Sequence, residues 1–155
     1  MKNLRILPLL MVVILGFTSC NSNAQTSKKT PKSTAKTTQS DVVSVSYKHT
    51  AGRGGFSNIV VTKDLVTSEA AGGMFTSYPK INRKTTTTEW NNLISSINVA
   101  SLEKIKNGAP QGHYDGPDEF ITIKTKTKEI NILNASSPEL TAIKNQLNKM
   151  VGARK

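Results

Sequence analysis

The clearest chemistry that this sequence offers is modification of a single thiol. Cys20 is the only cysteine among the 155 residues, and it directly follows the small residues Thr18 and Ser19. Before them lies an apolar run from Ile6 to Phe17, preceded by a basic start that includes Lys2. This run is shorter than the roughly 20 apolar residues that cross a bilayer. A basic start, a short apolar run and small residues at its end are typical of a secretory signal peptide.

The ending Phe17-Thr18-Ser19-Cys20 resembles the bacterial lipobox, although Phe17 stands where leucine is usual. In a lipobox the cysteine is alkylated by diacylglycerol and becomes the first residue after cleavage. The resemblance predicts a lipoprotein signal peptide over residues 1–19 and a lipid on Cys20. That lipid would anchor the chain to a membrane of the bacterial cell envelope, with its domain facing the periplasm or the exterior. The alternative is an ordinary signal peptide cut near Asn23-Ala24.

Residues 20–40 are predicted to be the lipidated cysteine followed by a disordered basic tether. Residues 21–40 contain no large apolar side chain, so they cannot bury enough surface to offset the entropy of ordering. A flexible segment of this length reaches about 25 Å. It carries four basic residues and no acidic one, namely Lys28, Lys29, Lys32 and Lys36.

Residues 41–155 are predicted to form one small domain, whose length is ordinary for a single core. Fifteen basic and ten acidic side chains leave this part with a net charge of +5, out of +11 for the whole chain. Its few aromatic residues are not interleaved with the basic ones as in a stacking platform, so no nucleic-acid partner is expected. The charge instead favours solubility and attraction to anionic lipid or glycan.

Three glycines surround an arginine in Gly52-Arg53-Gly54-Gly55, and two kinds of site are conceivable there. A phosphate loop would need a helix after the glycines. Here a strand pattern beginning at Phe56 follows, which favours a hairpin turn. Arg53, Gly54, Gly55 and Phe56 are therefore candidate protein-binding residues of an exposed turn.

A second cluster gathers possible metal ligands between residues 111 and 119, in a segment predicted to be a polar loop. The four side chains are His113, Asp115, Asp118 and Glu119. They lack the spacing of an EF-hand, and Asp115-Gly116-Pro117 is ordinary turn chemistry. No serine, threonine or histidine stands in the setting of a nucleophile. The sequence thus predicts neither an enzyme, a metal site nor a cofactor.

The elements that would position these residues follow from hydrophobic periodicity. Alternation with a period of two, broken by glycine and turn residues, predicts strands. Their expected ranges are 41–49, 56–63, 65–70, 120–124 and 129–133, with a further short strand at 74–78.

Two apolar stripes at helical spacing predict two helices. The first is capped by Thr86 or Thr87, and Thr86 with Glu89 has the spacing of a capping box. Its stripe runs from Trp90, the core anchor, through Leu93 and Ile94 to Ile97, and a short further turn follows over 99–105. The second begins at Ser136-Ser137-Pro138-Glu139 and ends at Gly152. The expected order is ββ(β)-α-ββ-α. It predicts an α+β fold with an antiparallel sheet of about 4–5 strands built from hairpins, and two helices packed on one face.

This layout, with Gly54-Gly55-Phe56 between two strands and Trp90-x-x-Leu93-Ile94 on the first helix, resembles the emfourin-type family of small proteinaceous protease inhibitors. Asp118-Glu119-Phe120-Ile121-Thr122-Ile123 and the helix start at Pro138-Glu139-Leu140 complete the resemblance, which spans about residues 43–150. The chain also resembles uncharacterised small bacterial lipoproteins with the same layout. The resemblance implies a protein-binding domain that inhibits thermolysin-like metalloproteases, with a secreted or envelope protein as partner. The alternative function is a structural envelope lipoprotein that binds anionic glycan or lipid through its basic surface.

Overall fold

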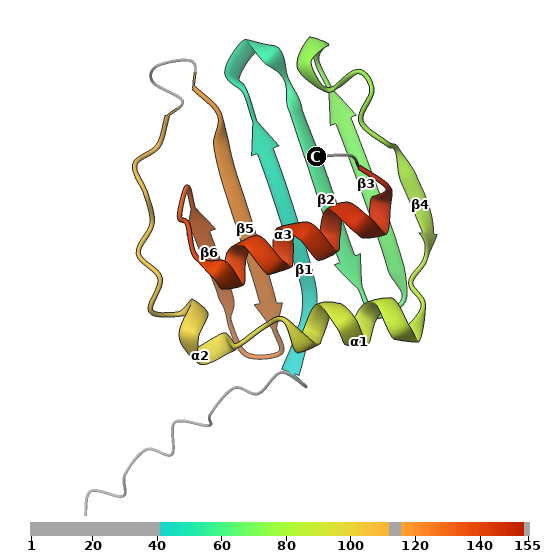
Figure 1. Ribbon diagram of the computed structural model, residues 1–155, viewed down its shortest axis with the longest axis vertical. Helices are drawn as coiled ribbons and strands as arrows, with labels where there is room; N and C mark the ends of the chain where they lie inside the picture. The colour runs from blue at the N-terminus through green and yellow to red at the C-terminus, as the bar shows by residue number, and fades with distance from the viewer. Residues whose placement is uncertain (1–40, 112–115, 154–155) are drawn as a thin grey trace, which may run out of the picture. The chain divides into compact units, whose positions relative to one another are not determined.

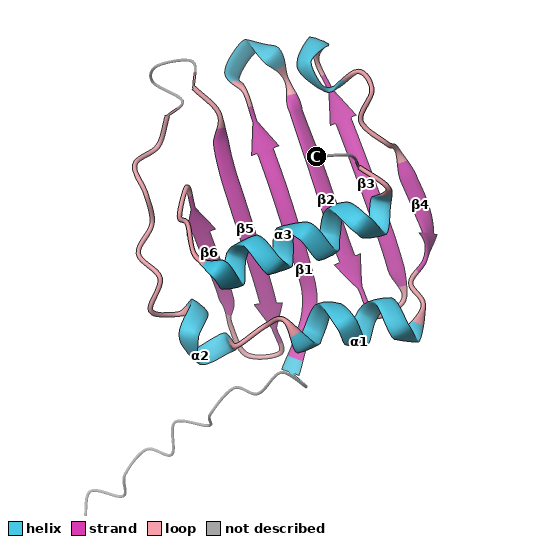
Figure 2. Ribbon diagram, viewed as in Figure 1, coloured by secondary structure: helices cyan, strands magenta, loops and turns pink. Residues whose placement is uncertain are grey.

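The computed structural model describes residues 41–111 and 116–153, which form a six-stranded antiparallel sheet with its helices on one face (Figures 1 and 2). The predicted α+β class is confirmed, although the sheet has more strands than expected. The predicted signal peptide, Cys20 and the predicted tether lie outside the described residues. In chain order the elements are β1 (Val42–Thr50), η2 (Gly52–Gly54), β2 (Phe56–Thr62), β3 (Leu65–Ala71), η3 (Gly73–Phe75), β4 (Ile81–Lys84), α1 (Thr87–Ser95), α2 (Val99–Leu102), β5 (Asp118–Thr125), β6 (Glu129–Leu133) and α3 (Pro138–Val151).

The strand order across the sheet is β4-β3-β2-β1-β5-β6, so the first strand of the domain lies near its centre. β1 pairs with β2 through the predicted glycine turn and with β5 from the second half of the chain. A bulge between Val42 and Ser44 shifts the β1–β5 register. Because of this extra residue, Val42 and Val45 are both buried, although they are three positions apart.

The core lies between the sheet and the helices, and it is built from alternate strand residues and the apolar stripes of the helices. Fully buried members include Val45, Ile59, Ile123, Leu93 and Ile143. Every apolar side chain that the structure shows as buried lies between residues 42 and 151. Residues 41–155 therefore carry a core of their own, and we expect this part to fold without the preceding segment.

Capping residues set the ends of the helices as the sequence predicts. The Glu89 amide donates to the Thr86 side chain, and the Glu89 carboxylate accepts from the Thr86 amide, which completes the capping box of α1. Ser137 caps α3, and Gly152 ends it in the left-handed conformation. None of the helices in the described ranges is long and apolar enough to cross a membrane.

Two expectations about the elements are wrong in detail. Residues 74–78 are not a strand, because the chain turns at Gly72 (φ +97°) and enters the short 3-10 helix η3. The next strand is instead β4, whose first residue pairs with Ser68. Helix α1 ends at Ser95, and Ile97 fills the core from the segment that follows.

Candidate functional site

Two glycine turns at one end of the sheet pack against each other. Residues 52–55 connect β1 to β2, and residues 72–75 follow β3, which is the neighbour of β2. The β2–β3 register places Phe56 opposite Ala71, so the two turns begin side by side. We call residues 52–55 and 72–75 together the paired-turn tip.

Backbone packing makes the paired-turn tip rigid. Gly55 and Gly72 both have positive φ, at +107° and +97°. A Cβ on Gly55 would overlap the carbonyl oxygen of Ala71, and one on Gly72 would overlap the backbone of Gly54 and Gly55. Glycine is therefore required at both positions, since any side chain would push the turns apart.

Hydrogen bonds within each turn add to this rigidity. The Ala51 amide donates to the Gly55 carbonyl at 2.9 Å, and the Gly54 amide donates to the Ala51 carbonyl at 2.7 Å. In the second turn the Phe75 amide donates to the Gly72 carbonyl at 3.1 Å. The backbone of the tip is therefore fixed without help from a partner.

Two side chains of the paired-turn tip, Met74 and Arg53, are exposed. Met74 is 70% exposed, more than any other large apolar side chain that the structure describes as exposed, and it contacts Gly54 so closely that a Cβ there would overlap its sulfur. Arg53 is exposed on the facing turn, and it forms no ion pair with any residue that the structure describes. Methionine and arginine are both enriched in protein–protein interfaces.

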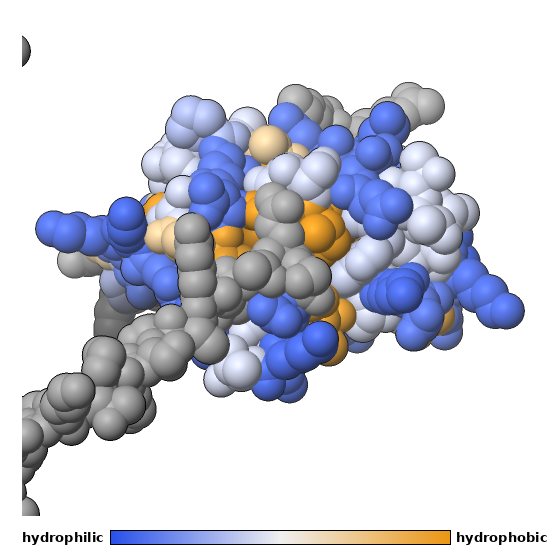
Figure 3. Space-filling view, turned by 90° about the horizontal axis from the view of Figure 1, so that it is seen from below, coloured by the Kyte–Doolittle hydropathy of each residue, from blue (hydrophilic) through white to orange (hydrophobic). Residues whose placement is uncertain are grey.

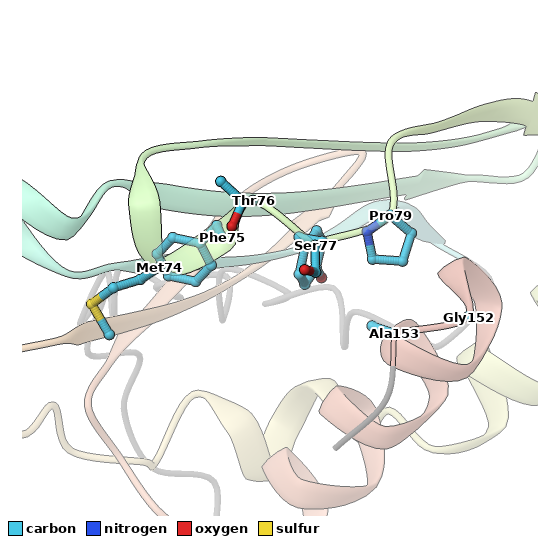
Figure 4. A pocket seen from close by; sticks show the side chains of 8 residues that line it. Met74, Phe75, Thr76, Ser77, Pro79, Gly152 and Ala153 are labelled. Atoms are coloured by element: carbon cyan, nitrogen blue, oxygen red, sulfur yellow. The ribbon is translucent and has the colours of Figure 1, made fainter.

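A recess of about 430 Å³ begins at Met74 and runs beside the segment after η3 to the end of α3 (Figure 4). Its wall consists of residues 74–79 together with Gly152 and Ala153. The buried Tyr78 hydroxyl finds no hydrogen-bond partner of good geometry among the described residues. Burial raises the pKa of Tyr78, and the nearby Ser57 hydroxyl partly offsets that rise.

A carboxylate network lies behind the tip on the helix-covered face. Glu119 accepts hydrogen bonds from the Tyr47 hydroxyl at 2.7 Å and from the Lys144 ammonium at 2.8 Å. Burial alone would raise the pKa of Glu119, but the contacts with Lys144 and Tyr47 outweigh it and hold this pKa below its ordinary value. Burial is the largest cause that raises the pKa of Tyr47, and the hydrogen bond to the Glu119 carboxylate raises it further. Glu119 therefore stays ionised and joins β5 to β1 and α3.

His49 connects this network to the paired-turn tip. It pairs across the strands with Glu119, and its ring meets Phe75 of η3 edge-to-face, with 5.3 Å between the ring centroids. The contact holds the second turn over the end of β1, so the tip rests on the sheet through a side chain as well as through its backbone.

Of the four residues considered as possible metal ligands, the structure describes two, Asp118 and Glu119. Asp118 and Glu119 belong to β5, not to a loop, because they pair with Thr50 and His49 of β1. The Asp118 carboxylate accepts from the Gln111 amide at 2.7 Å and from the Asn134 side chain at 2.6 Å. Both carboxylates thus join separate segments of the chain: Asp118 bonds to Gln111 and Asn134, and Glu119 to Tyr47 and Lys144. The other two candidates, His113 and Asp115, lie outside the described residues.

The four predicted protein-binding residues do not share one surface. Arg53, Gly54 and Gly55 belong to the paired-turn tip, as expected for an exposed turn. Phe56 begins β2 and lies under the Lys48 ammonium, 5.9 Å from the ring centroid. Its position alternates with the buried Ser57 and Ile59, so it belongs to the sheet face away from the core. Met74 is not among the predicted binding residues, because the sequence pattern predicts a strand at 74–78. The Gly72-Gly73 pair directly before it was the available indication of a second turn.

Comparison of the chain with protein-family models, with curated proteins and with solved structures found no match. The resemblance to emfourin-type inhibitors therefore stays a prediction.

Proposed function

We propose that the chain is an exported lipoprotein, anchored through lipid on Cys20 in the bacterial cell envelope, whose domain binds a partner protein through the paired-turn tip. The observation that carries the binding role is the exposure of Met74 on a backbone that is already fixed. A rigid loop loses little conformational entropy on association, so more of its contact energy appears as affinity. Arg53 adds a charged group of the kind that dominates many interfaces.

Within this class we propose inhibition of a thermolysin-like metalloprotease as the specific activity. An inhibitor must present a segment that the protease accepts but that does not rearrange after binding. The backbone hydrogen bonds and glycine contacts of the tip meet that requirement. The recess beside Met74 would receive side chains from the rim of the partner.

The test is titration of the domain, residues 41–155, into thermolysin and related secreted proteases. Stoichiometric loss of protease activity is expected. Met74→Ser should weaken inhibition at least tenfold, in the range of a central interface residue. Leu65→Ser removes another exposed apolar side chain, at the opposite end of the sheet, and should leave inhibition unchanged. If every one of these proteases keeps its activity in the presence of the domain, the inhibitor role is ruled out.

A broader test addresses protein binding by the tip without choosing the partner. A photo-crosslinking residue at position 74 in the full-length, exported chain should capture one envelope or secreted protein reproducibly. The same residue at position 65 is the matched control. Equal capture from both positions, or from neither, would contradict the assignment of the binding surface.

A second candidate function, binding of anionic lipid or glycan, is favoured by a different surface. Lysines gather at the end of the sheet where β1 begins, which is the end opposite the paired-turn tip.

A further inference from the structure

The end of the domain where β1 begins carries apolar and basic side chains together. Three large apolar side chains are exposed in the described part of the chain, and two of them, Val43 and Leu65, lie at this end. Figure 3 views this end and shows apolar surface bordered by hydrophilic side chains. Exposed apolar area of this kind in a small domain commonly marks an interaction surface.

A groove of about 600 Å³ crosses the same end. Six of its lining residues come from β1, the β2–β3 turn, α1 and the β5–β6 turn, namely Val42, Val43, Lys63, Asp64, Trp90 and Lys126. A smaller hollow of about 310 Å³ continues past Trp90 to Lys84. Trp90 is thus not only the core anchor that the sequence predicts, because its half-buried side chain also forms part of both walls.

The charge around this groove is positive. Five lysines lie in the strand ends and turns there: Lys63, Lys84, Lys124, Lys126 and Lys128. Two of them have acidic partners, since Lys126 lies 3.8 Å from the Asp41 carboxylate and Lys128 pairs with Glu103. Asp64 lines the groove, and Glu129 lies at the start of β6. Among the described residues, Lys63 and Lys84 form no ion pair, whereas Lys124 lies across the strands from Glu129. Lys63 and Lys84 are therefore the cations available to an anionic surface.

We propose that this end, defined by Val43, Lys63, Leu65, Lys84 and Trp90 and called the basal surface, docks onto an anionic lipid bilayer. Tryptophan with apolar neighbours suits the boundary between headgroups and acyl chains, and lysine is attracted to anionic headgroups. Asp41, the first described residue, lies beside this surface through its contact with Lys126. The segment that leads back to Cys20 therefore joins the domain at its basal surface.

This inference rests on the proposed lipid anchor at Cys20, because that anchor would keep the domain close to a membrane. The consequence is an orientation. When the basal surface lies on the bilayer, the paired-turn tip points away from it, because the two occupy opposite ends of the same strands. Docking would thus present the tip to a soluble partner.

The test uses the domain, residues 41–155, without lipid or tether, and vesicles that contain phosphatidylglycerol. Trp90 is the only tryptophan in the chain, so its fluorescence reports on the basal surface alone. At low ionic strength we expect a blue shift with these vesicles, a weaker one at physiological salt and little with phosphatidylcholine alone. An unchanged spectrum at low ionic strength would overturn the proposal.

Two charge-matched variants locate the surface. Lys63→Glu with Lys84→Glu should weaken vesicle binding by roughly 25-fold or more, about fivefold for each lysine lost. Arg53→Glu with Lys80→Glu changes the net charge equally, away from the basal surface, and should retain most of the binding. Equal loss in both variants would mean attraction by net charge only, and would also overturn the proposal. The protease titration is independent of either result, so failure of one proposal does not imply failure of the other.

Discussion

Replacing Gly55 with alanine tests whether close backbone packing holds the paired-turn tip together. Gly55 has φ +107° and ψ −153°, a region that is essentially restricted to glycine and costs other residues about 1–3 kcal/mol. The new Cβ would also overlap the Ala71 carbonyl at less than the 3.0 Å that real Cβ atoms keep. Forcing an extra methyl group into packed surroundings costs about 1–3 kcal/mol more. We therefore expect Gly55→Ala to lower the free energy of unfolding by about 4 kcal/mol.

Two other glycines separate the contributions to this value. Gly152 also has positive φ, at +71°, but a Cβ there would meet nothing within 4 Å. Gly152→Ala should therefore cost only the left-handed conformation, about 1–2 kcal/mol. Gly73 is open and does not have positive φ. Gly73→Ala should change the free energy of unfolding by less than about 0.5 kcal/mol.

Urea denaturation of residues 41–155, followed by tryptophan fluorescence, measures all three variants. Trp90 lies at the other end of the sheet from the tip, so its signal reports unfolding of the whole domain. Gly73→Ala should be the most stable of the three variants, Gly152→Ala the next and Gly55→Ala the least stable. If Gly55→Ala were no less stable than Gly152→Ala, the argument that the two turns need direct backbone contact would be refuted.

Three further outcomes are expected. Hydrogen bonds from Arg83 and from the Thr86 amide lower the pKa of Glu89 from 4.5 to about 2, so the ionised form stabilises the fold above pH 4.5 and this stabilisation is lost as the pH falls towards 2. In urea titrations, Glu89→Gln should therefore reduce the drop in the free energy of unfolding between neutral and acidic pH. The expected reduction is about 1 kcal/mol, because the Arg83–Glu89 pair is partly exposed. Ser137→Ala removes the cap on the Leu140 amide and should cost about 1 kcal/mol, whereas equal stability to its neighbour variant Ser136→Ala would contradict the cap. Cys20→Ala should abolish incorporation of labelled fatty acid and leave the urea midpoint of the domain unchanged; acylation of the variant would disprove the lipid site.

Local patterns in the sequence were sufficient to predict most of the elements. Alternation in β1 and β2, the capping box at Thr86 and the serine cap at Ser137 each depend on residues a few positions apart. Interactions between residues so close in sequence can be predicted before the tertiary structure is known. The order of hairpins and single helices then restricts the architecture to one layer of helices on an antiparallel sheet.

The parts that could not be predicted depend on contacts between distant residues. β4 has four residues, too few to show periodicity, and it is positioned by Ser68, whose hydroxyl donates to the Pro79 carbonyl and accepts from the Ile81 amide. The same holds for the paired-turn tip. Each glycine turn is visible in the sequence, but Met74 meets Gly54 only because the β2–β3 register places Ala71 opposite Phe56.

The central position of β1 also bears on the order in which the domain folds. β1 can form a meander with the next three strands as soon as they are available, because each of these connections is short. Its other edge waits for β5, whose residue Ile123 pairs with Val45 across 78 positions of sequence. Closing so long a loop is entropically costly and tends to be slow. Until β5 pairs with it, β1 presents an open edge with valine and tyrosine side chains, and an unpaired strand edge of this kind is prone to pair with another chain and aggregate.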